Sequence, residues 1–165
     1  MIQIVNPTPV VDSITLATAV ATTSGTAIDF VGIPDTAKRI TMMLRNVGTG
    51  NQENLLVRLG STTFQITGYT NIGYLRRINV SDAGGENTTG FPVTTSNAGN
   101  VTVVMTLNRI SGNNWMQTYN ARMGADFISL GAGEVTLSGV LDRVRFTTAA
   151  GVNAFNSGLA NISWE

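Results

Sequence analysis

The chain has 165 residues, in which ten lysines and arginines balance ten acidic residues, and only 12% of its residues are charged. It contains no histidine and no cysteine, which excludes Ser-His-Asp and cysteine catalysis, zinc sites built from these residues, and disulfides. A net charge of zero argues against an interface with nucleic acid, because neutralising phosphates needs an excess of basic residues.

The N-terminal region reads as an extended arm. Pro7 and Pro9 favour an extended backbone and lack N–H donors, and Ile2 and Ile4 add apolar side chains. We expect this arm to dock on a neighbouring subunit or partner, or to form an edge strand on its own domain. Residues 14–23, which follow it, are compatible with a short helix or with a strand.

The rest of the chain shows the period of two that is typical of strands, with turns rich in glycine and asparagine between them. The best hairpin joins residues 101–110 and 115–123, and residues 134–148 read as two strand pieces around Gly139. Further strands are predicted over residues 26–31, 38–47, 54–59, 62–67 and 159–164.

This pattern predicts an all-β protein with a single β-sandwich domain, jelly-roll-like in its strand order. Residues 1–24 form the arm and a first short element, and residues 25–165 form the sandwich. No apolar stretch is long enough to span a bilayer, so no membrane partner is expected. Exposed sheet edges with few charges to protect them predict association into a homotrimer.

Two segments resemble a known family. Residues 25–44 read GTAIDFVGIPDTAKRITMML, and residues 139–165 read GVLDRVRFTTAAGVNAFNSGLANISWE. Both are similar to a module of tailed-bacteriophage structural proteins, in which a leucine-rich strand, here residues 54–60, and a Gly-Tyr pair, here Gly68-Tyr69, follow the first segment.

This resemblance implies a virion component without enzymatic activity, made in the cytoplasm of the host bacterium. In the first place it implies a trimeric capsid decoration, or cement, protein on the outer capsid surface, with the major capsid protein or other virion proteins as partners. The alternative is a tip domain of a tail or head fibre that binds a receptor or carbohydrate.

Three residues suggest a binding face. Trp115, Gln117 and Tyr119 alternate along one side of a strand, where aromatic rings beside amides could stack on a sugar and read its hydroxyls. We favour the interpretation of the same residues as core or subunit-interface residues, since aromatics usually carry packing. The candidate contacts with a capsid or a second subunit are the arm residues and two adjacent arginines: Ile2, Ile4, Pro7, Pro9, Arg76 and Arg77.

No catalytic set, cofactor site or metal site is predicted. Asp82 and Glu86 lie in a glycine-rich loop, but two carboxylates supply fewer oxygens than a calcium site needs, which favours a solvated loop. The glycine-rich segments lack the spacing of phosphate-binding loops.

Overall fold

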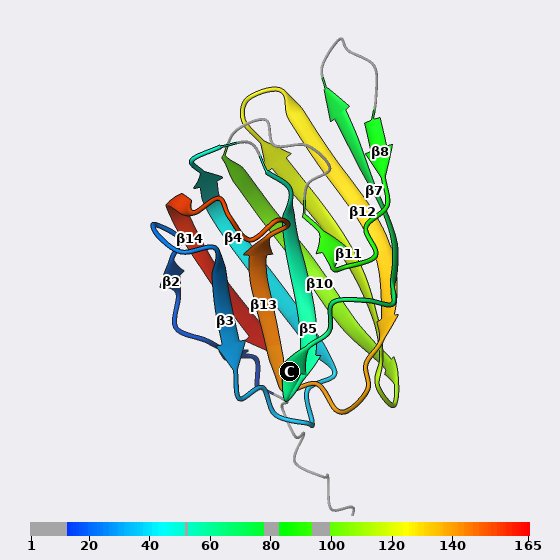
Figure 1. Cartoon of the computed structure of the whole chain (residues 1–165). Helices are drawn as coiled ribbons and strands as arrows, with labels where there is room; N and C mark the ends of the chain where they lie inside the picture. Colours follow the sequence, from blue (N-terminus) through cyan, green and yellow to red (C-terminus); the bar gives the residue numbers. More distant parts are fainter. Residues whose placement is uncertain (1–12, 52, 78–82, 94–99) are drawn as a thin grey trace, which may run out of the picture.

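The computed structural model describes residues 13–51, 53–77, 83–93 and 100–165, which form two β-sheets packed around one apolar core (Figure 1). No helix occurs in these residues, and every strand pairing among them is antiparallel. The prediction of an all-β sandwich is therefore confirmed, whereas the strand order does not confirm the finer expectation of a jelly roll.

The larger sheet has nine strands, and β2 pairs with β14 beside the main strand order. In spatial order its main strands are β1 (Thr15–Leu16), β14 (Phe155–Trp164), β4 (Arg39–Thr49), β10 (Val101–Ser111), β11 (Asn114–Met123), β12 (Phe127–Thr136), β7 (Tyr69–Arg77) and β8 (Ala83–Gly85), and β2 is Val20–Ala21. The segment 14–23, which was compatible with helix or strand, thus forms two short edge strands.

The smaller sheet has five strands and covers part of the larger one. Its main order is β3 (Ala27–Val31), β13 (Arg143–Thr148), β5 (Leu55–Ser61) and β6 (Thr63–Phe64), and β9 (Phe91–Pro92) pairs with β5. In Figure 1 this sheet lies over β14, β4 and β10, while β12, β7 and β8 extend beyond it.

The predicted hairpin is confirmed as β10 and β11, which turn at Gly112 with a positive φ of 51°. Such a φ favours glycine, because a Cβ there crowds the backbone. The predicted strand pieces around Gly139 are the end of β12 and the whole of β13. Gly139 itself lies in the connection that carries the chain from the larger sheet to the smaller one.

The core forms where the period of two turns apolar residues inward from both sheets. On β4 the buried side chains include Ile40, Met42 and Leu44, and on β5 they include Val57 and Leu59, as the alternation predicts. These residues belong to a single cluster that the two sheets share, so the sandwich has one core.

Strands β7 and β12 depart from this pattern. Their inward positions include Asn71, Ser129, Gly131 and Gly133, whereas their outward positions include large apolar side chains. A Cβ on Gly131 would stand 2.4 Å from Cε1 of Tyr119, so the Tyr119 ring occupies the space that an inward side chain would need. The middle of these two strands is therefore small and polar inside and apolar outside, while Tyr69, Leu75 and Val135 at their ends are buried in the core.

Candidate interaction surface

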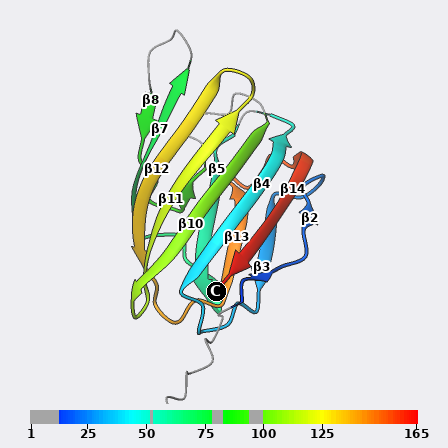
Figure 2. The ribbon, with the colours of Figure 1, turned by 180° about the vertical axis from the view of Figure 1, so that it is seen from behind.

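The outer face of the larger sheet is the side that β7, β12, β11 and β10 turn away from the core, and Figure 2 views the sheet from this side. The register of the strands aligns its side chains in rows that run across the sheet. Two adjacent rows, called the central rows below, contain Tyr74, Leu130, Asn120 and Val104, and then Ile72, Ala132, Thr118 and Thr106.

The central rows contain no charged residue, and they continue onto β4 and β14 through Met43 and Asn161, and through Thr41 and Ser163. Large apolar side chains stand exposed in them and in the flanking rows, with exposed fractions between 39% and 60%: Ile72, Tyr74, Val104, Met116, Ile128 and Leu130. Four of these side chains, those of Ile72, Tyr74, Ile128 and Leu130, lie on the neighbouring strands β7 and β12. Exposed apolar side chains gathered in this way mark interaction sites in soluble proteins.

Charges lie at the two ends of this face. Arg76 and Arg122 flank Ile128 in the row beyond Tyr74, and we call this the arginine end. Glu134 lies between Thr70 and Met116 in the row beyond Ile72, and we call this the glutamate end. Within the described residues the side chains of Arg76, Arg122 and Glu134 form no ion pair.

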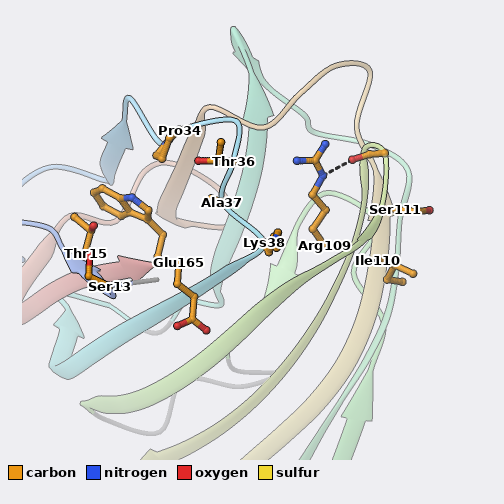
Figure 3. A pocket seen from close by; sticks show the side chains of 12 residues that line it. Ser13, Thr15, Pro34, Thr36, Ala37, Lys38, Arg109, Ile110, Ser111 and Glu165 are labelled. Atoms are coloured by element: carbon orange, nitrogen blue, oxygen red, sulfur yellow. Dashed lines mark hydrogen bonds between the residues drawn. The ribbon is translucent and has the colours of Figure 1, made fainter. Parts of the chain in front are cut away.

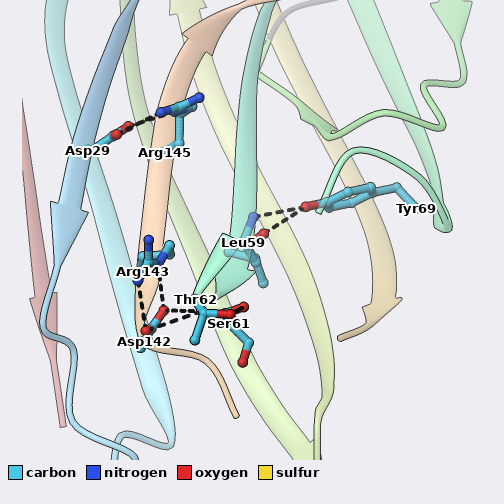
Figure 4. Close-up of polar contacts among 8 residues, drawn as sticks. All are labelled: Asp29, Leu59, Ser61, Thr62, Tyr69, Asp142, Arg143 and Arg145. Carbon is cyan, nitrogen blue, oxygen red and sulfur yellow. Dashed lines mark hydrogen bonds and ion pairs between the residues drawn. The ribbon is translucent and has the colours of Figure 1, made fainter. Parts of the chain in front are cut away.

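The outer face of the smaller sheet has a different character, because two of the three arginines described on it form ion pairs with aspartates (Figure 4). Arg145 donates two hydrogen bonds of 2.7 Å to the carboxylate of Asp29, and the Phe64 ring lies 4.1 Å from its guanidinium carbon. Hydrogen bonding to Asp29 raises the pKa of Arg145. Arg58, which lies beside Arg145 on β5, has no acidic partner in the described residues and donates a 2.8 Å hydrogen bond to the carbonyl of Thr89.

A second ion pair lies at the end of the same sheet. Arg143 donates to both carboxylate oxygens of Asp142, at 2.7 and 3.0 Å, and the backbone N–H of Thr62 also donates to that carboxylate. The hydrogen bonds from Arg143 lower the pKa of Asp142, because they favour its charged form. The sequence pattern places an arginine beside this aspartate, and the structure joins the two.

Tyr69 links the two sheets. It begins β7 in the larger sheet, and its buried hydroxyl accepts a 2.8 Å hydrogen bond from the backbone N–H of Leu59 in the smaller sheet (Figure 4). The same hydroxyl donates to the carbonyl of Gln65. Burial raises the pKa of Tyr69 to about 12, since the phenolate would lose its hydration. Tyr69 is thus a structural residue.

The interpretation of Trp115, Gln117 and Tyr119 as a glycan-binding face is wrong. All three are buried on the inner side of β11, so no ligand in solution reaches them. The hydroxyl of Tyr119 forms a 2.9 Å hydrogen bond with Ser129, whereas neither the Gln117 amide nor the Trp115 indole N–H has a partner in the described structure. The period of two predicts that these residues share a face, but not which face the second sheet covers.

The other candidate contacts have mixed outcomes. Arg76 is exposed on the outer face, and Arg77 ends β7, although its side chain lies outside the described part of the chain. The arm residues Ile2, Ile4, Pro7 and Pro9 also lie outside the described residues. Asp82 lies outside them too, while Glu86 is exposed in the segment after β8.

The residues that the sequence analysis missed are the exposed apolar ones on β7 and β12. Their signal is present in the sequence as Ile72 and Tyr74, and as Ile128 and Leu130, each pair two residues apart and beside glycines. Two apolar residues at this spacing share one side of a strand. Gly73 lies within the first pair and Gly131 follows the second. Both weaken the prediction of a strand, because glycine is unfavourable within strands.

The two segments that carry the family resemblance contact one another. They contribute neighbouring strands in both sheets, β3 beside β13 and β4 beside β14. The N–H of Ile33 donates to the carbonyl of Asp142 at 3.0 Å, and the side chains of Arg39 and Glu165 form an ion pair. The residues that carry the resemblance thus hold the sandwich together by joining its first strands to its last.

An open cleft of about 810 Å³ lies at the end of the sandwich where β14 finishes (Figure 3). Its lining includes the partly exposed ring of Trp164 together with Lys38, Glu165 and Arg109. Arg109 is held in place by hydrogen bonds to the carbonyls of Gly112 and Asp35, at 2.6 and 2.8 Å. The cleft combines one aromatic surface with charges of both signs.

Among the described residues no cluster of three or more acidic side chains is placed to hold a metal ion. In the same part of the chain no helix has the length and hydropathy needed to cross a membrane. Comparison of the chain with protein-family models, with curated proteins and with solved structures finds no match.

Proposed function

We propose that this chain is a non-enzymatic structural protein of a tailed-phage virion: a homotrimeric capsid decoration protein on the outer capsid surface. The observation that carries the proposal is the uncharged outer face of the larger sheet, with the exposed side chains of Ile72, Tyr74 and Leu130. A solvent-facing sheet of this kind is suited to permanent protein contacts. The resemblance of residues 25–44 and 139–165 to a phage module supports a virion as the assembly in which these contacts form.

The chemistry of the chain supports a binding role over catalysis. It has neither histidine nor cysteine, and the ion pairs Asp29–Arg145 and Asp142–Arg143 lie on the face of the smaller sheet rather than in a cleft. Paired carboxylates of this kind stabilise structure and are not free to transfer protons. The partners we propose are the major capsid protein or another virion protein, with neither nucleic acid nor membrane involved.

The experiment is a measurement of copy number in purified particles, by quantitative mass spectrometry or by cryo-electron microscopy. A decoration protein is expected in numbers comparable with the major capsid protein, as density on the outer capsid surface. A few copies per particle, located on a fibre or tail, would contradict the decoration role. Absence of the chain from particles would contradict a virion role altogether.

A carbohydrate-binding fibre tip is the second candidate, and the cleft beside Trp164 is the observation that favours it. An exposed indole beside charged and hydroxyl groups can stack on a sugar ring and bind its hydroxyls. Glycan-array binding that Trp164→Ala abolishes would support this function. Phe91→Leu, a change in the buried core at the edge of the smaller sheet, is the matched control and should retain any binding.

A further inference from the structure

We propose that the outer face of the larger sheet joins copies of this chain head to tail, with the arginine end of each copy against the glutamate end of the next. The occupant of the face is therefore a second copy of the chain, and three copies close a ring around a common axis. The number three rests on the proposed function, whereas the choice of face and its direction rest on the described residues alone.

In the middle of β7 and β12, polar and small residues face the core while apolar residues face outward. Inside, Asn71 and Ser129 are fixed by hydrogen bonds: Asn71 donates to the carbonyl of Gly90 at 3.2 Å, and Ser129 donates to that of Tyr74 at 3.0 Å. Outside, Ile72 is 60% exposed and Leu130 is 47% exposed. A solitary sandwich would gain by the reverse arrangement, because burial of apolar surface drives folding. The apolar side of these strands is therefore suited to burial by another molecule.

The charges at the two ends of the outer face favour one direction of contact. The central rows are uncharged, so covering them buries no unpaired charge, which would be costly. Arg76 and Arg122 stand at one end of these rows, and Glu134 stands at the other. Contact between like ends would bring arginines together, whereas contact between opposite ends pairs them with glutamate. Charge thus selects the head-to-tail direction.

The size of the face is suited to three copies. Side chains on one face of a strand repeat every two residues, about 7 Å apart, so the span from the arginine end to the glutamate end is about 20 Å. Three such faces arranged as a triangular prism leave about 6 Å between each sheet and the axis. This is close to half of the spacing of about 10 Å between packed sheets, so the central rows would fill the middle of the ring.

The experiment uses the absence of native cysteine to place a crosslink. In the double variant Ile128→Cys/Thr70→Cys the cysteines lie beside Arg122 and Glu134 in the end rows and leave both charges in place. This variant is treated with a bis-maleimide crosslinker and run on a denaturing gel. We expect covalent trimers from the double variant, covalent dimers from a mixture of the two single variants, and monomers from either single variant alone. Both positions are exposed, and circular dichroism checks that each variant is folded.

The other outcomes overturn the inference in distinguishable ways. Crosslinking of Ile128→Cys alone would show that like ends meet. Covalent dimers as the only product of the double variant would show that two copies associate rather than three. Monomers throughout would show that the face lies elsewhere if light scattering still gives a trimer, or that no trimer exists if it does not. None of these results bears on the copy number in particles, which tests the proposed function separately.

A charge exchange provides a second measurement that needs no crosslinker. Glu134→Arg should weaken association about tenfold or more, because three arginines then meet at each contact. Adding Arg76→Glu and Arg122→Glu to that variant should restore association, since opposite charges again face each other. Weakening by Glu134→Arg without rescue would contradict the head-to-tail contact.

Discussion

The two outer faces of this sandwich use the same kinds of residue in opposite ways. On the smaller sheet, Arg145 is held by Asp29 and covered by the Phe64 ring, so its charge is satisfied within the chain. On the larger sheet, Arg122 and Glu134 stand at opposite ends of an uncharged apolar surface and form no ion pair within the described residues. The smaller sheet thus pairs most of its charges within the chain, whereas the larger sheet exposes apolar side chains and charges to the partner proposed above.

The largest expected effect separates the two faces directly. Leu130→Glu places a charge in the central rows and should weaken self-association about 100-fold or more, since an unpaired charge in a buried contact costs about 3–5 kcal/mol. Val31→Glu is the matched control, because Val31 is 64% exposed on the outer side of β3 in the smaller sheet. Sedimentation equilibrium measures both. Equal weakening by the two variants would abolish the distinction between the faces.

The second prediction concerns the link between the sheets at high pH. The pKa of Tyr69 is about 12 in the folded chain against an ordinary value of 10, so the unfolded chain loses this proton first as the pH rises. Stability is therefore independent of this group well below pH 10 and falls by about 2–3 kcal/mol between about pH 10 and pH 12. Urea unfolding across this range measures the loss.

The control for the alkaline loss is Tyr69→Phe, which removes the titrating hydroxyl. Its free energy of unfolding should fall less over the same pH range than that of the wild type. A parallel fall in both proteins would assign the loss to other groups, such as Tyr119, whose pKa burial also raises.

At neutral pH the same variant tests the hydrogen bonds of Tyr69. Tyr69→Phe leaves the buried N–H of Leu59 without its 2.8 Å acceptor, which should lower the free energy of unfolding by about 1–2 kcal/mol. Thermal and urea unfolding measure this cost. Thr118→Val, which removes an exposed hydroxyl on the outer face of β11, is the comparison variant and should change stability less.

The smallest effect is the coupling within the face of the smaller sheet. A double-mutant cycle with Asp29→Asn and Arg145→Gln should give about 0.5–1 kcal/mol, the range for ion pairs whose side chains remain 31–37% exposed. The same cycle with Arg122→Gln and Glu134→Gln should give no coupling when all four proteins of the cycle also carry Leu130→Glu, which prevents association. A clear coupling there would show that the outer face of the larger sheet pairs its own charges.

The alternation of side chains was sufficient to predict much of the fold. It correctly identified the hairpin of β10 and β11 and the buried residues Ile40, Met42 and Leu44 of β4. These predictions succeeded because one side of these strands of the larger sheet faces the core, where their alternate apolar residues are buried in the usual way. The long-range pairing of β3 with β13 and of β4 with β14 has no local signal, because it joins the beginning of the sandwich to its end.

By itself the sequence determined the all-β class, through its period of two and its turns, and it excluded histidine and cysteine chemistry. The tertiary structure alone decided which side of each strand is exposed. Trp115 and Tyr119 are buried because the second sheet covers their side of β11, while Ile72 and Leu130 are exposed because no described strand covers their side of β7 and β12. A period of two shows which residues share a face, but only the packing of the two sheets determines whether that face meets the core or solvent.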